Sequence, residues 1–80
     1  MPQLTVSQTK RLQTIYPGCR FLLFSKPQSI KSILEGLLGY KMKSKLLPKK
    51  IIRAVSTDGR TVAVLNEATW EVIYRYAPQI

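Results

Sequence analysis

The sequence predicts a small α+β domain that spans residues 1–80 as a single unit. Apolar residues make up 45% of the chain, and they gather in patches between turn signals, as they do in folded domains. A stretch after Ser25 repeats apolar residues at helical spacing, and two stretches around Asp58-Gly59 have the pattern of a hairpin. The predicted order is helix, strand, helix and three strands (α-β-α-β-β-β), with a three-stranded antiparallel meander packed by the amphipathic second helix.

The first predicted element is a short helix that begins near Ser7. Leu12, Ile15 and Tyr16 share one face of it at spacings of three and four residues. Ser7 is a suitable N-cap, because its hydroxyl can accept a backbone N–H of the first turn. Pro17-Gly18 then ends the helix.

Arg20–Phe24 is a compact apolar run between turn signals. Runs of this length are typical of a strand covered on both faces, and this one is a candidate central strand. The single cysteine, Cys19, precedes it. One cysteine forms neither an internal disulfide nor a zinc site, and we interpret Cys19 as a small buried residue rather than a reactive thiol.

The second helix carries the strongest periodic signal. Ser25 and Gln28 have the spacing of a capping box, and Pro27 suits the first turn. Gly39 is a candidate for its end, and the positive charges of Lys41 and Lys43 suit the negative C-terminal pole of a helix. Its apolar stripe, which we expect to cover the sheet, is Ile30, Ile33, Leu34, Leu37 and Leu38.

The hairpin is the clearest local prediction. Ile51–Ser56 and Thr61–Leu65 flank Thr57–Arg60, and Asp-Gly between two such runs predicts a type I′ turn. If Thr57 faces Arg60, the register sets Val55 against Val62, Ala54 against Ala63, Arg53 against Val64, and Ile52 against Leu65.

A turn at Asn66–Thr69 precedes the last predicted strand, Trp70–Tyr76. Its β-rich composition favours a strand, and a helix capped by Asn66 is the rival interpretation. In a regular strand, Trp70, Val72, Tyr74 and Tyr76 would point to one face, and Glu71, Ile73 and Arg75 to the other.

Positive charge is the main functional signal. The chain has 13 Lys and Arg against 4 Asp and Glu, for a net charge of +9. No carboxylate falls between Glu35 and Asp58, and six cations crowd into Lys41–Arg53. Such a run repels itself and is stabilised beside a polyanion. The candidate phosphate contacts are Lys41, Lys43, Lys45, Lys49, Lys50, Arg53 and Arg60.

Trp70, Tyr74 and Tyr76 are candidates for stacking on unpaired bases. The alternative interpretation is that these rings form the core face of the sheet. For the lysines, the alternative is a solvated surface without a partner. No zinc-finger spacing or aromatic RNA-binding motif is present, so no base specificity is predicted.

The composition offers little for catalysis. The chain has no His and only four carboxylates, so the usual proton carrier at neutral pH is missing. The sequence contains no metal-ligand cluster, P-loop or nucleophile motif, and we expect no metal or cofactor. A nuclease built from Lys, Arg and Tyr is the remaining enzymatic alternative, and it rests on general analogy with small ribonucleases.

The sequence therefore predicts a small basic nucleic-acid-binding protein, with RNA and DNA equally open. The alternative is an accessory subunit or inhibitor that docks on an acidic protein surface. Attachment to a membrane ranks last, because the apolar stripe is needed for the core. Open sheet edges would also allow a homodimer. We expect a cytoplasmic protein, since Met1–Gln13 has no apolar signal-peptide core and no apolar run approaches roughly 20 residues.

Overall fold

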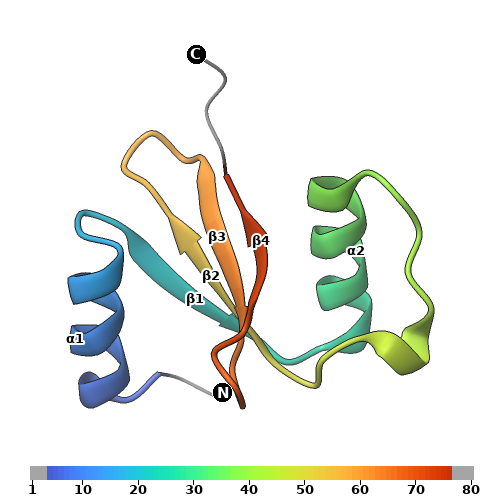
Figure 1. Cartoon of the computed structure of the whole chain (residues 1–80), viewed down its shortest axis with the longest axis horizontal. Helices are drawn as coiled ribbons and strands as arrows, with labels where there is room; N and C mark the ends of the chain where they lie inside the picture. The colour runs from blue at the N-terminus through green and yellow to red at the C-terminus, as the bar shows by residue number, and fades with distance from the viewer. Residues whose placement is uncertain (1–3, 77–80) are drawn as a thin grey trace.

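The computed structural model describes residues 4–76. Within this range a four-stranded antiparallel sheet lies between two helices, α1 (Val6–Ile15) and α2 (Pro27–Leu38) (Figure 1). A 3-10 turn, η1 (Ser44–Leu46), lies in the connection from α2 to the second strand. The small α+β class is confirmed. The strands are β1 (Arg20–Phe24), β2 (Ile51–Val55), β3 (Thr61–Asn66) and β4 (Val72–Arg75).

The sheet has the order β1-β2-β3-β4, and each neighbouring pair is antiparallel. The predicted three-stranded meander is therefore wrong in its strand number, because β1 joins the same sheet by pairing with β2. The interpretation of Arg20–Phe24 as a central strand is also wrong, since β1 is an edge. β1 is apolar because the helices cover its two faces, not because it has a neighbouring strand along each edge.

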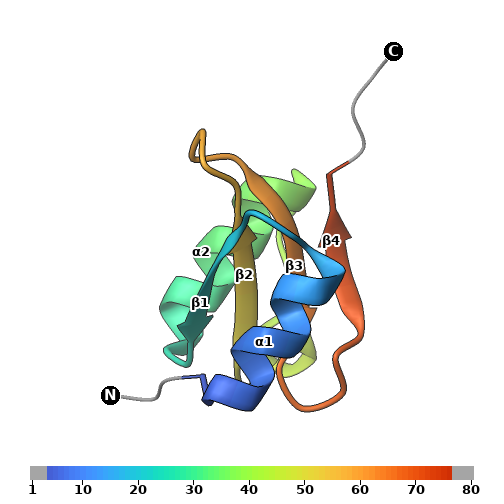
Figure 2. The same cartoon turned by 90° about the vertical axis from the view of Figure 1, so that its left-hand side faces the viewer.

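Each face of the sheet has its own core, and α1 and α2 cover opposite faces. Figure 2 shows α1 in front of the strands and α2 running diagonally behind them. The central strand β2 is covered on both sides, because Ile51 belongs to one core and Ile52 to the other. The fully buried residues on the α2 face are Ile30, Leu34, Ile51 and Val64, and those on the α1 face include Leu12 and Ile52.

Helix α1 begins two residues earlier than Ser7 would predict. Thr5 is the N-cap, since Thr5 Oγ1 accepts the N–H of Gln8 at 3.1 Å and Gln8 Oε1 accepts the N–H of Thr5 at 2.9 Å. The prediction of Ser7 as the N-cap is wrong. Thr5 is the N-cap because Gln8 lies three residues after it and completes a capping box, whereas Lys10 lies three residues after Ser7 and cannot do so.

Helix α2 begins at Pro27, and Lys26 occupies its N-cap position without a side-chain hydrogen bond. The predicted capping box at Ser25 is therefore wrong. Proline disfavours a helical conformation in the residue before it, so the helix starts at the proline itself and Ser25 falls outside. At the other end, Gly39 adopts φ of 79° and donates its N–H to Glu35 O at 2.9 Å. Lys41 and Lys43 follow the end of the helix.

The hairpin β2–β3 has the predicted pairing at Ala54 with Ala63, Arg53 with Val64, and Ile52 with Leu65. Val55 instead lies opposite Thr61, because the register shifts between Ala54 and Val55.

The cause of this shift is a turn of a different type from the predicted I′. Gly59 has φ of 85°, whereas Asp58 is not among the residues with positive φ, and a I′ turn needs positive φ at both central positions. The N–H of Gly59 bonds to Ser56 O at 3.0 Å, and the N–H of Ser56 bonds to Arg60 O at 2.9 Å. These bonds enclose a three-residue loop, in which the extra residue displaces the register.

The last segment forms a strand only over Val72–Arg75. Trp70 lies in the preceding turn with φ of 61°, and its N–H bonds to Asn66 O at 2.7 Å. The predicted alternation is wrong, because Trp70 packs against the α1-side core while Tyr74 packs against the α2-side core. Within residues 4–76, neither helix is long and apolar enough to cross a bilayer.

Candidate nucleic-acid interface

Five exposed lysines follow the segment that joins α2 to β2. We call them the lysine strip: Lys41, Lys43, Lys45, Lys49 and Lys50. The segment leaves the C-terminal end of α2, descends along the outer side of that helix and passes through η1 to the start of β2 (Figure 1). The strip therefore borders one side and one end of the molecule.

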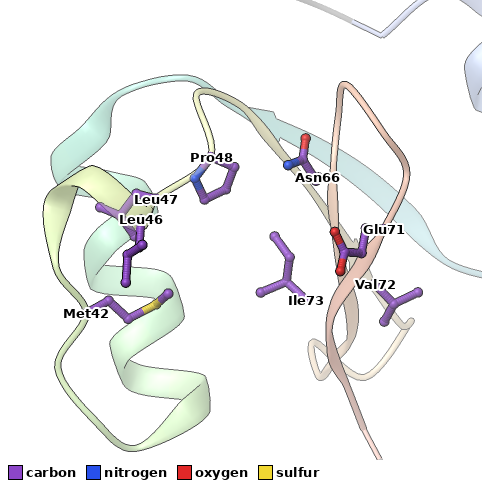
Figure 3. Close-up of a pocket in the computed structure, with 8 residues that line it drawn as sticks. All are labelled: Met42, Leu46, Leu47, Pro48, Asn66, Glu71, Val72 and Ile73. Atoms are coloured by element: carbon purple, nitrogen blue, oxygen red, sulfur yellow. The ribbon is translucent and has the colours of Figure 1, made fainter.

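Apolar residues between the lysines hold this segment against the fold. Met42 and Leu47 pack on the α2-side core, so the neighbouring lysines are left facing water. Figure 3 shows Met42 and Ile73 turned toward each other across a pocket of about 460 Å³ between the segment and β4. Glu35 Oε2 also accepts the N–H of Met42 at 3.0 Å. These contacts tie the segment that carries the strip to α2 and to the α2-side core.

Arg53 differs from the strip because it lies within the sheet. It is half-buried on β2, and its Nε donates to Thr61 Oγ1 at 2.6 Å. Thr61 is only 5% exposed, and Arg53 provides the partner that its buried hydroxyl needs. This bond fixes the guanidinium at one position on the α2 face of the sheet.

Arg60 lies in the hairpin loop, at the opposite end of β2 from Lys49 and Lys50. Its guanidinium lies 4.8 Å from the ring centre of Tyr76, and its Nη1 donates to the Tyr76 hydroxyl at 2.8 Å. The structure thus brings together one predicted phosphate contact and one predicted stacking residue. The seven predicted contacts lie on three parts of the fold, with five in the strip, Arg53 on β2 and Arg60 in the hairpin loop.

The three candidate stacking residues do not form a common platform. Trp70 packs on the α1-side core, where the guanidinium of Arg11 lies 5.0 Å from its ring centre. Tyr74 packs on the opposite face. All three rings are half-buried. The core interpretation therefore describes Trp70 and Tyr74, and Tyr76 is the ring that lies beside a predicted phosphate contact.

Two of the four carboxylates are engaged by local groups. Glu35 accepts the N–H of Met42, as described above. Asp58 accepts a hydrogen bond from the Ser56 hydroxyl and another from the N–H of Arg60 at 3.1 Å. These bonds, that of Ser56 above all, lower the pKa of Asp58 below its ordinary 3.8. The turn therefore uses Asp58 as a carboxylate that organises the loop.

A second group of polar residues was missed by the sequence analysis. Gln28, Ser29 and Ser32 on α2 line a depression beside Arg53. In the sequence they are only the polar positions next to the apolar stripe, and nothing there links them to a residue on β2. Thr61 was missed for the same reason, since its partner depends on the hairpin register.

Within residues 4–76, no three His, Cys, Asp or Glu side chains gather in a way that could hold a metal ion. No known protein family, curated protein or solved structure matches the chain.

Proposed function

We propose that this protein binds nucleic acid, either RNA or DNA, by contacting phosphates through Lys41–Arg53 and the hairpin residue Arg60. The observation that carries the proposal is the lysine strip, whose five ammonium groups are exposed on a segment held in place by Met42 and Leu47. The proposed role needs neither catalysis nor a cofactor. A cytoplasmic location belongs to the proposal, because the lone Cys19 suits a reducing compartment.

The physical reason for a polyanionic partner is repulsion within the strip. Its lysines crowd along a short segment, and the nearest carboxylate before it, Glu35, bonds to the backbone of Met42. A nucleic acid relieves this repulsion and releases its own condensed counterions on binding, which favours association. Lysine presents a flexible point charge, so these contacts position a phosphate backbone and carry no information on base sequence.

The aromatic side chains play a smaller part in the proposed interface. Trp70 and Tyr74 are committed to opposite cores, which removes them from a shared stacking surface. The pair Arg60 and Tyr76 remains available at the hairpin end, where both a cation and a ring could meet a nucleotide.

A salt titration tests the proposal. With about four to six lysines on phosphates, the log of the affinity for duplex DNA should fall against the log of the salt concentration with a slope of roughly −4 to −5. Replacing Lys41, Lys43 and Lys45 by Gln should reduce the steepness of this slope by about 3. Fluorescence anisotropy with a labelled duplex and a labelled single-stranded RNA measures both values.

The matched control removes three other exposed cations, Lys10, Arg20 and Arg75, also by substitution with Gln. It loses the same charge at other places on the surface and should keep most of the slope. Equal effects from both triple variants would reject the strip as the site. Absent or salt-insensitive binding would reject the function.

The alternative proposal is an accessory subunit or inhibitor that docks on an acidic protein. It is supported by the pocket beside β4, since Val72 is 46% exposed at this sheet edge and Leu46 is 67% exposed at the pocket rim. A purified partner that binds stoichiometrically after nuclease digestion, and loses binding on Leu46→Ser substitution, would favour this alternative over nucleic acid.

A further inference from the structure

A depression of about 420 Å³ lies between α2 and β2, and Arg53, which lines it, follows the last lysine of the strip by three residues. Figure 2 shows α2 running diagonally behind the strands. On the sheet, Leu22 of β1 lies directly opposite Arg53 of β2, with Leu22 43% exposed and Arg53 half-buried. The lining residues are Phe24, Gln28, Ser29, Ser32, Ile33 and Arg53.

The guanidinium of Arg53 is positioned before any ligand arrives. Its Nε donates to Thr61 Oγ1 at 2.6 Å, and Thr61 is buried in the hairpin. On β3, the residue directly opposite Arg53 is Val64, which is fully buried. Within residues 4–76, Nε is the only atom of the Arg53 side chain that donates a hydrogen bond. Both terminal NH2 groups therefore remain for a ligand.

The rest of the lining suits an oxyanion. Ser29 and Ser32 supply hydroxyl groups, Gln28 supplies an amide, and none of the described lining residues carries a carboxylate. Phe24 and Ile33 provide an apolar wall. A planar guanidinium can donate two parallel hydrogen bonds to one phosphate, whereas a lysine ammonium acts as a point charge.

We propose that this depression is a phosphate-binding subsite, in which Arg53 forms the paired hydrogen bonds and the hydroxyls of Ser29 and Ser32 take the remaining oxygens. Thr61 is a positioning residue, because it acts only through Arg53. That the phosphate belongs to a nucleic acid rests on the function proposed above, whereas recognition of the phosphate group itself does not.

NMR titration with inorganic phosphate tests the subsite directly. The expected result is saturable shifts at Arg53 Nε–H and at the backbone amides of Ser29 and Ser32. Arg53→Lys should weaken phosphate binding by about tenfold, since it removes the paired geometry while keeping the charge. Arg75→Lys, at an exposed position on β4, should leave the affinity unchanged.

Two further variants keep the test independent of folding defects. Ser32→Ala lies on an exposed helical position where alanine is well tolerated, and it should weaken phosphate binding severalfold. Its control is Ser7→Ala on α1, with no effect expected. Thr61→Val should weaken binding and broaden or shift the Arg53 Nε–H signal before any phosphate is added. Shifts confined to the lysine strip, or unchanged affinity in Arg53→Lys and Ser32→Ala, would overturn the subsite.

A second titration separates free phosphate from nucleic acid as the source of the group. An oligonucleotide with a 5′-phosphate, the same oligonucleotide with a 5′-hydroxyl, and a mononucleotide are added in turn. If the nucleic acid supplies the phosphate, the oligonucleotides shift the Arg53 Nε–H signal, and Arg53→Lys lowers their affinity. Inorganic phosphate binding without any oligonucleotide effect would retain the subsite and reject its link to nucleic acid. Steep salt-dependent duplex binding with no response at Arg53 would retain the proposed function and reject the subsite.

Discussion

At the residue scale, two arginines show how position decides what the same side chain does. Arg53 is half-buried and bonded to Thr61, so it presents a guanidinium of fixed orientation beside α2. Arg60 is exposed and rests on the ring of Tyr76 at the end of the hairpin. The first suits recognition of a single phosphate, and the second suits a looser contact near a nucleotide. Neither role follows from the residue type alone.

The loop that carries Arg60 depends on the charge of Asp58. The hydrogen bond from Ser56 is the largest cause of its lowered pKa. A lowered pKa means that the carboxylate stabilises the folded state fully above the ordinary value of 3.8, and that this contribution is lost as the pH falls through the folded pKa.

Ser56→Ala should therefore raise the pKa of Asp58 toward 3.8 and move the acid-induced loss of the turn to higher pH. The bond from the Arg60 N–H should keep the pKa from returning completely. Carboxyl chemical shifts followed from about pH 6 to about pH 2 measure the change. Thr57→Ala is the control, and an identical pKa in the two variants would refute the role assigned to Ser56.

At the element scale, each helix is placed by its ends as much as by its apolar face. Thr5 and Gln8 satisfy each other's backbone groups at the start of α1. Pro27 fixes the start of α2, and the left-handed Gly39 ends it. The glycine also redirects the chain along the outer side of α2 (Figure 1), which is why the lysine strip lies beside this helix rather than on it.

The two candidate caps of α1 can be compared directly. Thr5→Ala should lower the free energy of unfolding by about 1 kcal/mol, because the N–H of Gln8 loses its acceptor. Ser7→Ala should change it by less than about 0.5 kcal/mol, because Ser7 lies inside the helix. Urea unfolding of both variants provides the measurement. A larger loss for Ser7→Ala than for Thr5→Ala would contradict the observed cap.

At the scale of the whole molecule, excess positive charge and a small core oppose each other. A net charge of +9 is held within a radius of gyration of 12.4 Å, which is comparable to the screening length of about 10 Å at 0.1 M salt. The folded protein therefore carries repulsion that salt or a polyanion can relieve. This links stability to the proposed function, because the same positive charges attract both the ions that screen them and a nucleic acid.

Raising the salt concentration from about 0.02 M to about 0.2 M should increase the unfolding temperature by about 5 °C, which corresponds to about 1 kcal/mol in a domain of this size. The variant with Gln at Lys41, Lys43 and Lys45 should show a smaller increase, since it has less repulsion to screen. Thermal unfolding followed by circular dichroism measures both. A decrease with salt, or the same increase in both proteins, would contradict this explanation.

Features that depend on neighbours in the chain could be predicted from the amino-acid sequence alone. The apolar stripe of α2, the strand Arg20–Phe24, the middle of the hairpin register and the exposed lysines around Met42 and Leu47 all follow from local spacing. Local spacing reports which residues must be buried, and it does so reliably where several apolar positions agree. Local spacing likewise indicates that the lysines between these apolar residues are exposed, which makes them candidate phosphate contacts.

Which segments meet depends on the three-dimensional fold. It placed β1 at an edge of the sheet, put α1 over the second face, turned Trp70 and Tyr74 to opposite cores and set Arg60 beside Tyr76. It also bonded Arg53 to Thr61 and placed Arg53 in the same depression as two serines of α2. These contacts link residues far apart in the chain, and they depend on strand pairing and helix direction, which no local pattern encodes.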